Sequence, residues 1–432
     1  MLTAILLAIV ALAPDAADRP NIVVFVGDDL GYGDLGCYGH PRIKTPTLDR
    51  LAADGIRLTS FYSGAPICSP SRAALFTGRT PYRVGIRDWI KEDSGVFLPR
   101  SEVTIPQRLR EAGYRTCLSG KWHLNSRFNG SEPTPGEFGF DHWFATQNNA
   151  PHLNPGNFVR NGKRVGPLRG AASTVTVDEA IGFIAEASSK PFAIFVTFHA
   201  PHEQVAAPEE YTSMYADIDD PTKRDYYGSI TLIDAEIGRL LAELDARDLR
   251  DRTLVIFTSD NGPQKLLGYP RAIHSHGSSG PLRGHKLSMY EGGYREPAIL
   301  RWPGHIKAGA ESAEPAGFVD LLPTLCALAG AAPPADRILD GVNILPLLLE
   351  GKAVDRPRPF YWQFDYAQEG PWTQSMRKGP WKLLADAGRK NFALYNVEED
   401  VAERHDRAAD LPELVKGLRT EMEAFQFPDA KQ

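Results

Sequence analysis

Strand-like apolar runs alternate along the chain with segments of helical periodicity. The runs cover residues 21–26, 113–120, 192–198 and 253–258. Nearly unbroken rows of Val, Ile, Leu and Phe are typical of strands buried on both faces. The clearest helix is predicted at residues 221–246, where Ile and Leu recur at spacings of three, four and seven. Shorter helices are predicted at 47–54 and 106–112. This alternation predicts a doubly wound α/β domain with a mostly parallel sheet.

Charged or metal-binding side chains follow each strand-like run. They are Asp28 and Asp29 after the first, Lys121 and His123 after the second, His199 and His202 after the third, and Asp260 and Asn261 after the fourth. In open parallel sheets, ligands bind at the carboxyl ends of the strands. The pattern therefore predicts a single crevice onto which all four endings converge.

The pattern changes after residue 333. Short strands are predicted at 360–364, 375–384 and 392–396, followed by a helix at 411–425. We predict a catalytic domain over 19–333 and a small C-terminal α+β subdomain over 334–432, with a four-stranded antiparallel sheet. Two irregular regions, 125–170 and 262–293, are expected near the mouth of the site.

The N-terminus has the pattern of a secretory signal peptide. Residues 2–13 are almost all apolar, and small residues precede residue 18. We predict a signal peptide over 1–18 and export to the periplasm or medium, although the only positive charge before the apolar run is the α-amino group. An uncleaved anchor and a first strand are the alternatives. An apolar run of about 12 residues is short of the roughly 20 needed to span a membrane, so no stable membrane association is expected.

Composition excludes one class of partner. The 432 residues carry a formal net charge of −6, without the basic field that nucleic-acid binding requires. The four cysteines, Cys37, Cys68, Cys117 and Cys326, are widely spaced and form no disulfide framework. One bridge remains an alternative.

The two acidic strand endings together predict a metal site. Asp28, Asp29 and Asp260 offer carboxylates and Asn261 offers an amide oxygen. An all-oxygen set of this kind suits Ca²⁺ or Mg²⁺ and not Zn²⁺. The competing interpretation is a solvated loop, because adjacent residues of a strand point to opposite faces.

A helix is predicted to begin at Cys68. The stretch 68–79 reads Cys-Ser-Pro-Ser-Arg-Ala-Ala-Leu-Phe-Thr-Gly-Arg. Free N–H groups at a helix start, with Arg72 one turn further on, favour a bound anion such as a sulfate or phosphate ester. A buried cysteine with a surface arginine is the alternative for the Cys-x-x-x-Arg spacing alone.

The stretch 68–79 resembles the sulfatase signature, Cys-x-Pro-Ser-Arg-x-x-x-Leu/Phe-Thr-Gly-Arg, at every fixed position. The resemblance extends from residue 20 to about 404, and the texture is most similar to the arylsulfatase A and N-acetylgalactosamine-6-sulfatase type. It implies an alkaline-phosphatase-like core, with a large mixed, mostly parallel sheet between helices. It also implies that Cys68 is oxidised to formylglycine, whose hydrate is the nucleophile, by a formylglycine-generating or anaerobic maturase enzyme. The divalent cation, commonly calcium with magnesium as the alternative, would be held by Asp28, Asp29, residue 68, Asp260 and Asn261.

The resemblance implies roles for other residues. Residues 120–123 match a Gly-Lys-Trp-His motif, in which Lys121 contacts the sulfate and His123 the hydrate. His202 matches the histidine that protonates the departing alcohol, although the local sequence does not separate it from His199. Arg72 and Lys286 would bind the sulfate. His285 departs from the family pattern, which has glycine before the lysine.

Two other segments complete the resemblance. Glu291 and Arg295 are expected to form a buried pair within Glu-Gly-Gly-x-Arg-x-Pro, and residues 378–383 match a C-terminal motif, Lys-Gly-Pro-Trp-Lys-Leu. The aromatic residues Trp362, Tyr366 and Trp372 are candidates for stacking against a sugar.

The expected activity is therefore hydrolysis of a sulfate ester, on a sulfated carbohydrate or an aryl sulfate. Two alternatives remain. One is hydrolysis of phosphate or phosphonate esters, whose tetrahedral oxyanions have a similar size. The other is a non-catalytic protein that binds sulfated glycans and keeps Cys68 as a thiol.

Overall fold

The computed structural model describes residues 19–186 and 188–427. The predicted signal peptide over 1–18 lies outside the described residues. Within the described part of the chain, no helix combines the length and the apolar character needed to cross a membrane.

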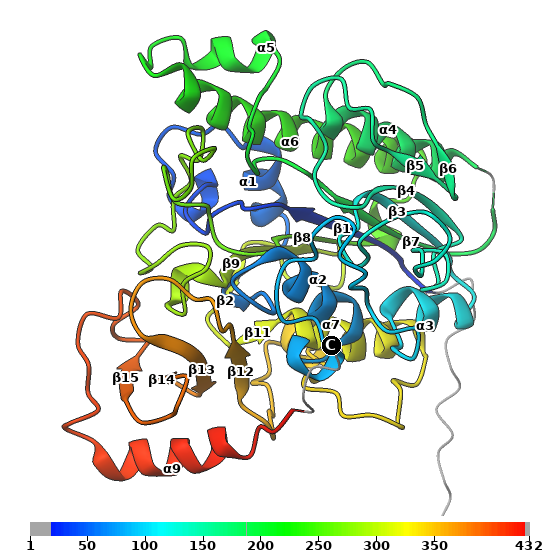
Figure 1. Cartoon of the computed structure of the whole chain (residues 1–432). Coiled ribbons are helices and arrows are strands. Elements are labelled where there is room, and N and C mark those ends of the chain that lie inside the picture. The colour runs from blue at the N-terminus through cyan, green and yellow to red at the C-terminus, as the bar shows by residue number, and fades with distance from the viewer. Residues whose placement is uncertain (1–18, 187, 428–432) are drawn as a thin grey trace, which may run out of the picture.

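An eleven-stranded sheet runs through the larger part of the molecule (Figure 1). Its order is β10-β2-β9-β8-β1-β7-β3-β4-β5-β6, with β11 also paired to β2. The pairings from β8 through β1, β7 and β3 to β4 are all parallel, whereas β9 runs antiparallel to both its neighbours. The strands are β1 (Asn21–Gly27), β2 (Ile56–Tyr62), β3 (Arg115–Lys121), β4 (His142–Thr146), β5 (Val159–Arg160), β6 (Lys163–Arg164), β7 (Phe192–Thr197), β8 (Thr253–Ser259), β9 (Arg295–Arg301), β10 (Ala310–Ser312) and β11 (Ala316–Gly317).

Helices cover both faces of this sheet. In Figure 1, α1, α4 and α6 lie above it and α2, α3 and α7 below it. The helices are α1 (Pro46–Ala53), α2 (Cys68–Thr77), α3 (Ile105–Glu111), α4 (Ala172–Ala185), α5 (Glu209–Thr212), α6 (Pro221–Ala246), α7 (Phe318–Ala329), α8 (Leu345–Glu350) and α9 (Pro412–Glu423). The sheet with its two helical layers confirms the predicted doubly wound α/β class.

The central strand β1 is buried on both faces, which explains its unbroken apolar sequence. Ile22, Val24 and Val26 belong to the core between the sheet and helices α2 and α7. Val23 and Phe25 belong to the core between the sheet and helices α1, α4 and α6. Both sets are fully buried. Water reaches neither face, so no polar residue interrupts the strand.

A second, four-stranded antiparallel sheet forms the C-terminal part, coloured orange in Figure 1. Its strands are β12 (Phe360–Gln363), β13 (Trp372–Lys378), β14 (Trp381–Asp386) and β15 (Phe392–Asn396). It has its own small core, in which Met376, Leu383 and Leu394 of the strands pack with Leu418 and Met422 of α9. The predicted antiparallel sheet and final helix are confirmed.

Three strands, β4, β5 and β6, lie inside a region that was predicted to be irregular, and β4 is the longest of them. The segment His142–Thr146 forms β4, which pairs in parallel with β3 within residues 125–170. Its five residues are too short to stand out among the surrounding Gly, Pro and Asn. The long-range pairing with β3, and not the local pattern, makes it a strand.

Candidate active site

The acidic residues that follow β1 and β8 converge at the carboxyl ends of these strands. Asn261 donates from Nδ2 to Asp29 Oδ1 at 2.7 Å, and the backbone N–H of Asp29 donates to Asp260 Oδ1 at 3.2 Å. Asp29 has φ 61°, a left-handed conformation that is uncommon for a residue other than glycine. This turn ends the strand alternation, which would have directed the two neighbouring carboxylates to opposite faces.

Each carboxylate of this cluster is paired with a buried cation. Lys121 Nζ lies 2.7 Å from Asp28 Oδ2, and Lys286 Nζ lies 2.7 Å from Asp29 Oδ2. Arg72 Nη2 lies 2.8 Å from Asp260 Oδ2. The structure thus brings together all the predicted metal-binding carboxylates and all three predicted sulfate-binding cations.

Cys68 begins α2 and is buried beside this cluster. Burial raises the pKa of its thiol, against the opposing charges of Lys121 and Lys286. A thiol with a raised pKa is a poor nucleophile at neutral pH, because the thiolate is the reactive form. The position therefore does not favour catalysis by an unmodified cysteine.

The carboxylate cluster fits a hard divalent cation. Asp28 Oδ1 and Asn261 Oδ1 are buried oxygens that accept no hydrogen bond from the described residues. Burial and the charge of Asp28 raise the pKa of Asp260 to about 7, against the charge of Arg72, so a bound cation would favour the ionised form of this carboxyl. Unpartnered oxygen ligands and crowded carboxylates are both relieved by Ca²⁺ or Mg²⁺.

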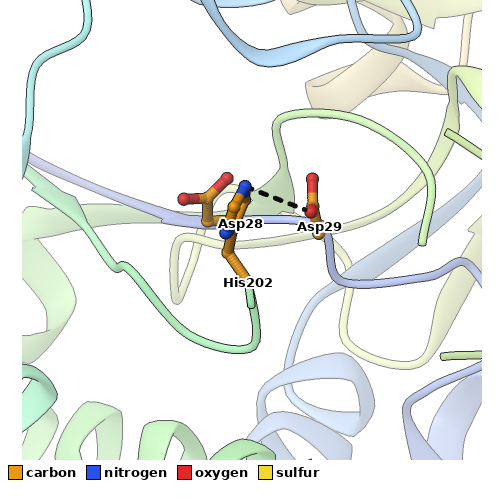
Figure 2. A group of neighbouring side chains, drawn as sticks. All are labelled: Asp28, Asp29 and His202. Atoms are coloured by element: carbon orange, nitrogen blue, oxygen red, sulfur yellow. Dashed lines mark ion pairs between the residues drawn. The ribbon is translucent and has the colours of Figure 1, made fainter. Parts of the chain in front are cut away.

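Figure 2 shows His202 facing both Asp28 and Asp29 from another segment of the chain, with Nε2 3.6 Å from Asp29 Oδ2. These three side chains form a group that could hold a metal ion, so His202 is a candidate ligand in addition to the oxygen set predicted from the sequence.

Hydrogen bonds indicate which ring nitrogen of His202 carries a proton. His202 Nδ1 lies 2.6 Å from the carbonyl oxygen of Glu203. A carbonyl can only accept, which favours the proton of the neutral ring on Nδ1. Asn149 Nδ2, which lies 2.9 Å from Nδ1 and 3.3 Å from Nε2, then donates to Nε2, the nitrogen that faces the carboxylates. Burial lowers the pKa of His202 to about 4. Nε2 is therefore the atom at which a proton could be gained and released.

His199, the alternative left open by the sequence, is engaged elsewhere. Its Nε2 lies 2.7 Å from Thr146 Oγ1 at the end of β4, and the ring packs edge-on against Phe158. Burial lowers the pKa of His199 well below its ordinary value. The structure thus distinguishes the two histidines by their partners, and His202 is the one that faces the carboxylates.

His123 is also held as a neutral ring. Its Nε2 donates to the carbonyl oxygen of Ile90 at 3.1 Å, whereas its Nδ1 is buried without a hydrogen-bond partner among the described residues. Burial, reinforced by the charges of Lys121 and Arg72, lowers the pKa of His123 well below its ordinary value. A neutral imidazole with one free lone pair can accept a proton.

The segment that carries Lys286 packs closely against the end of β8. The N–H of Gly262 donates to the carbonyl oxygen of Gly293 at 3.0 Å, and a Cβ on Gly262 would lie 1.9 Å from the carbonyl oxygen of Gly292. Only glycine permits this approach. The backbones of the Asp-Asn-Gly and Glu-Gly-Gly motifs are therefore in direct contact, which explains why both motifs contain glycine.

A buried charge network joins this segment to the C-terminal sheet, and sequence reasoning missed it. Lys382 Nζ of β14 lies 3.0 Å from Glu291 Oε1 and 2.9 Å from Glu403 Oε1, all without exposure to solvent. Glu291 also pairs with Arg295 at 3.2 Å, which confirms the predicted buried pair. The Lys-Gly-Pro-Trp-Lys-Leu motif was the available signal, because it placed a lysine between apolar residues of a strand, Trp381 and Leu383.

The suggested role of Trp362 in sugar stacking is wrong. Trp362 is 2% exposed, its ring stacks on Tyr294 at 4.6 Å between centroids, and its indole N–H donates to the carbonyl oxygen of Ser63. It fills the contact between the two sheets. Trp372 is half-buried and donates to Tyr290 Oη, whereas Tyr366 is 68% exposed and remains a candidate for sugar stacking.

Comparison with known proteins gives a consistent assignment. The sulfatase family model matches residues 20–331, and the model for the C-terminal region of N-sulphoglucosamine sulphohydrolase matches residues 284–427. Human (Homo sapiens) N-acetylgalactosamine-6-sulfatase is 38% identical over 376 residues, which cover 81% of this chain and 69% of that protein. Human arylsulfatase A is 36% identical over 405 residues, which cover 87% and 77%.

A solved structure extends the similarity to the whole fold. Ps i-CgsB in complex with k-i-k-neocarrahexaose superposes with a TM-score of 0.87 at 28% identity, covering 96% of this chain and 94% of that one. Its likeness includes the C-terminal sheet as well as the large one. The chain therefore belongs to the sulfatase family and is a sulfuric ester hydrolase.

Proposed function

We propose that this enzyme removes sulfate from a sulfated carbohydrate, with formylglycine made from Cys68 and a bound divalent cation. The observation that carries the proposal is the convergence of three buried cation–carboxylate pairs on the residue that begins α2. Such a site offers positive charge to a small tetrahedral anion at a helix start. The same proposal assigns residues 19–333 to the catalytic domain and 334–432 to the C-terminal subdomain.

The chain has residues for the two groups that the family chemistry requires, a divalent cation and a formylglycine. Asp28, Asp29, Asp260 and Asn261 would hold the cation, for which we favour Ca²⁺ with Mg²⁺ as the alternative. When present, the cation polarises the sulfate oxygens and the hydrated aldehyde offers a nucleophilic oxygen.

The remaining work falls to side chains of this chain. Arg72, Lys121 and Lys286 would bind the non-bridging oxygens of the sulfate and stabilise the charge that develops there. Their pairing with carboxylates fixes their positions before substrate arrives. Although burial would lower the pKa of Lys286, the Asp29 carboxylate raises it, so the ammonium stays charged.

The two buried histidines would move protons. His202 would protonate the leaving alcohol from Nε2, since a bound sulfate ester brings negative charge beside the ring and raises its low pKa. His123 would accept a proton at Nδ1. Each such step contributes roughly 10²–10⁴-fold to the rate.

The names of similar proteins guide the choice of substrate class. They include sulfatases of N-acetylgalactosamine 6-sulfate and a structure bound to a neocarrahexaose. We therefore favour a sulfated sugar over a small aryl sulfate as the natural substrate. Export through the predicted signal peptide and maturation by a formylglycine-generating or anaerobic maturase enzyme are parts of the same proposal.

The decisive experiment is peptide-mass analysis of the peptide containing Cys68, combined with activity. We expect a mass loss of about 18 Da, from cysteine to formylglycine, together with turnover of 4-nitrophenyl sulfate that chelation abolishes and Ca²⁺ restores. Cys68→Ala should abolish turnover without unfolding the protein. Cys326→Ala is the matched control, because Cys326 is also buried but lies in α7.

Other outcomes would redirect the assignment. Faster turnover of phenyl phosphate or phenyl phosphonate than of the sulfate would favour a phosphoester hydrolase. A thiol that stays unmodified after expression with a maturase, with glycan binding but no turnover, would favour a binding protein.

A further inference from the structure

A cluster of three polar side chains lies beside the predicted sulfate-binding lysine, and the chemistry described above does not use it. Glu369 Oε1 lies 3.6 Å from His285 Nδ1 and 4.0 Å from Lys265 Nζ. The three side chains are 31%, 36% and 60% exposed, respectively. They come from three separate segments: the loop after β8, the Lys286 segment, and the loop between β12 and β13.

The backbone fixes this cluster relative to the active site. The N–H of Gln368 donates to the carbonyl oxygen of Leu287 at 2.7 Å, and the N–H of Leu287 donates to that of Pro66 at 2.9 Å. The β12–β13 loop is thus attached to the residue after Lys286, which is in turn attached to the segment entering α2. His285 directly precedes Lys286, so their Cα atoms lie about 3.8 Å apart. The cluster is therefore attached through the backbone to the segment that carries Lys286.

The loop after β8 extends from this cluster to the segment of the predicted acid. Lys265 faces Glu369 at one end, while the N–H of His274 donates to Glu203 Oε1 at 2.6 Å at the other. Glu203 follows His202, which would protonate the leaving alcohol. The alcohol part of the substrate would thus leave the site alongside residues 265–274.

The donor and acceptor set suits sugar hydroxyl groups. A carboxylate accepts hydrogen bonds from two hydroxyls, an ammonium donates, and an imidazole can do either. The His285 ring beside Glu369 lowers the pKa of that carboxyl, so the carboxylate is ionised at neutral pH. A second sulfate group would meet this negative charge, whereas neutral hydroxyls would not.

We propose that Glu369, His285 and Lys265 form a subsite for the hydroxyl groups of the sugar unit next to the sulfated one. This subsite rests on the proposed function, because it would bind the alcohol part of the same substrate. Tyr366, exposed in the same loop, offers an aromatic face for the ring of that sugar. His285 supplies a hydrogen-bonding side chain that the glycine usual at that position in the family lacks.

The test compares an aryl sulfate with sulfated oligosaccharides in each variant. Matured wild-type enzyme, Glu369→Gln, Glu369→Ala and His285→Gly are assayed on 4-nitrophenyl sulfate, 6-sulfated chondroitin oligosaccharides and carrageenan hexasaccharides. We expect the ratio of kcat/KM on the cleaved oligosaccharide to kcat/KM on the aryl sulfate to fall about 10- to 100-fold in Glu369→Ala, as for a lost hydrogen bond to a charged group. The loss should be mainly in KM. Glu350→Gln is the matched control, because Glu350 also pairs with a lysine, Lys352, but on the surface.

The outcomes separate the two proposals. Failure of the wild-type enzyme to hydrolyse any sulfate ester would contradict the proposed function. Wild-type turnover of the aryl sulfate but of none of the saccharides would overturn the subsite alone. An equal fall on both substrates in Glu369→Ala, accompanied by a lower Tm, would also overturn it, since the cluster would then only attach the loop to the core.

Discussion

Lys286 Nζ and Asp29 Oδ2 lie 2.7 Å apart, with side-chain exposures of 7% and 1%. The pair places one ammonium group beside Cys68 and gives it a fixed direction. Replacing Lys286 with Met removes this charge from the proposed sulfate clamp and leaves a buried carboxylate without its partner. We expect Lys286→Met to lower kcat/KM for 4-nitrophenyl sulfate by about 10²–10³-fold.

Steady-state kinetics at several metal concentrations would check this value. Lys416→Met is the control, because Lys416 is 78% exposed on α9. Similar kinetics for the Lys286 variant and the control would remove Lys286 from the clamp.

His202 and His199 should differ in how their loss depends on the leaving group. Without His202, we expect kcat for an alkyl sulfate to fall by about 10²–10⁴-fold, but for 4-nitrophenyl sulfate by less than about tenfold, because nitrophenolate departs without a proton. His199→Asn breaks the contact with Thr146 and should lower the free energy of unfolding by about 1–3 kcal/mol, without this dependence. Equal dependence in both variants would argue against His202 as the acid.

Lys382 should matter for stability more than any exposed lysine of the same sheet. Lys382→Met leaves Glu403 buried beside Glu291 without its cation, while Glu291 keeps its ion pair with Arg295, and breaking a buried pair in this way costs about 3–5 kcal/mol. Urea unfolding would measure the loss. Lys378→Met, which breaks an exposed pair with Glu421, should cost less than about 1 kcal/mol. Adding Glu403→Gln to Lys382→Met should recover part of the loss, and no recovery would mean that packing, not charge, is responsible.

His40 predicts a pH dependence of stability. Its Nδ1 accepts the N–H groups of Ile43 at 2.8 Å and Arg42 at 3.1 Å. Burial and the charge of Lys223 lower the pKa of His40 from 6.5 to about 4. His40 therefore binds a proton more readily in the unfolded chain than in the folded one. The stability contributed by neutral His40 is present above about pH 6.5 and is lost as the pH falls toward 4.

The variant His40→Asn keeps a side-chain acceptor but does not titrate. Between pH 7 and pH 4.5 it should lose about 1–2 kcal/mol less stability than the wild type, after allowing for solvent screening. Denaturant titrations at several pH values would show the difference. Parallel stability curves for the two proteins would contradict it.

The strands and the acidic endings were predictable because their signals are local. The runs that form β1, β7 and β8 have unbroken apolar centres, and the acidic and histidine residues of the site lie directly after them. The long helix α6 was predicted at the same residues, Pro221–Ala246, because its apolar stripe is regular. In the structure, Asp220 caps its start.

The remaining features depend on contacts between distant segments. Trp362 is an aromatic residue in a short strand, and only its partners Tyr294 and Ser63 show that it belongs to the core. His199 is distinguished from His202 by its hydrogen bond with Thr146, a residue of strand β4, which was not predicted. The position of Glu369 beside His285 depends on how the two sheets dock. None of these relationships has a local pattern.

The contact between Lys382 and Glu291 also orders events in time. Cys68 is 4% exposed in the finished fold. The neighbouring segment that carries Lys286 is fixed in place by the ion pair between Glu291 and Lys382 of the C-terminal sheet. Roughly 300 residues of synthesis, or about 15–60 s at ordinary rates, separate the emergence of Cys68 from that of Lys382. An enzyme that oxidises Cys68 would have this interval, extended by any delay in export, in which to reach an open thiol.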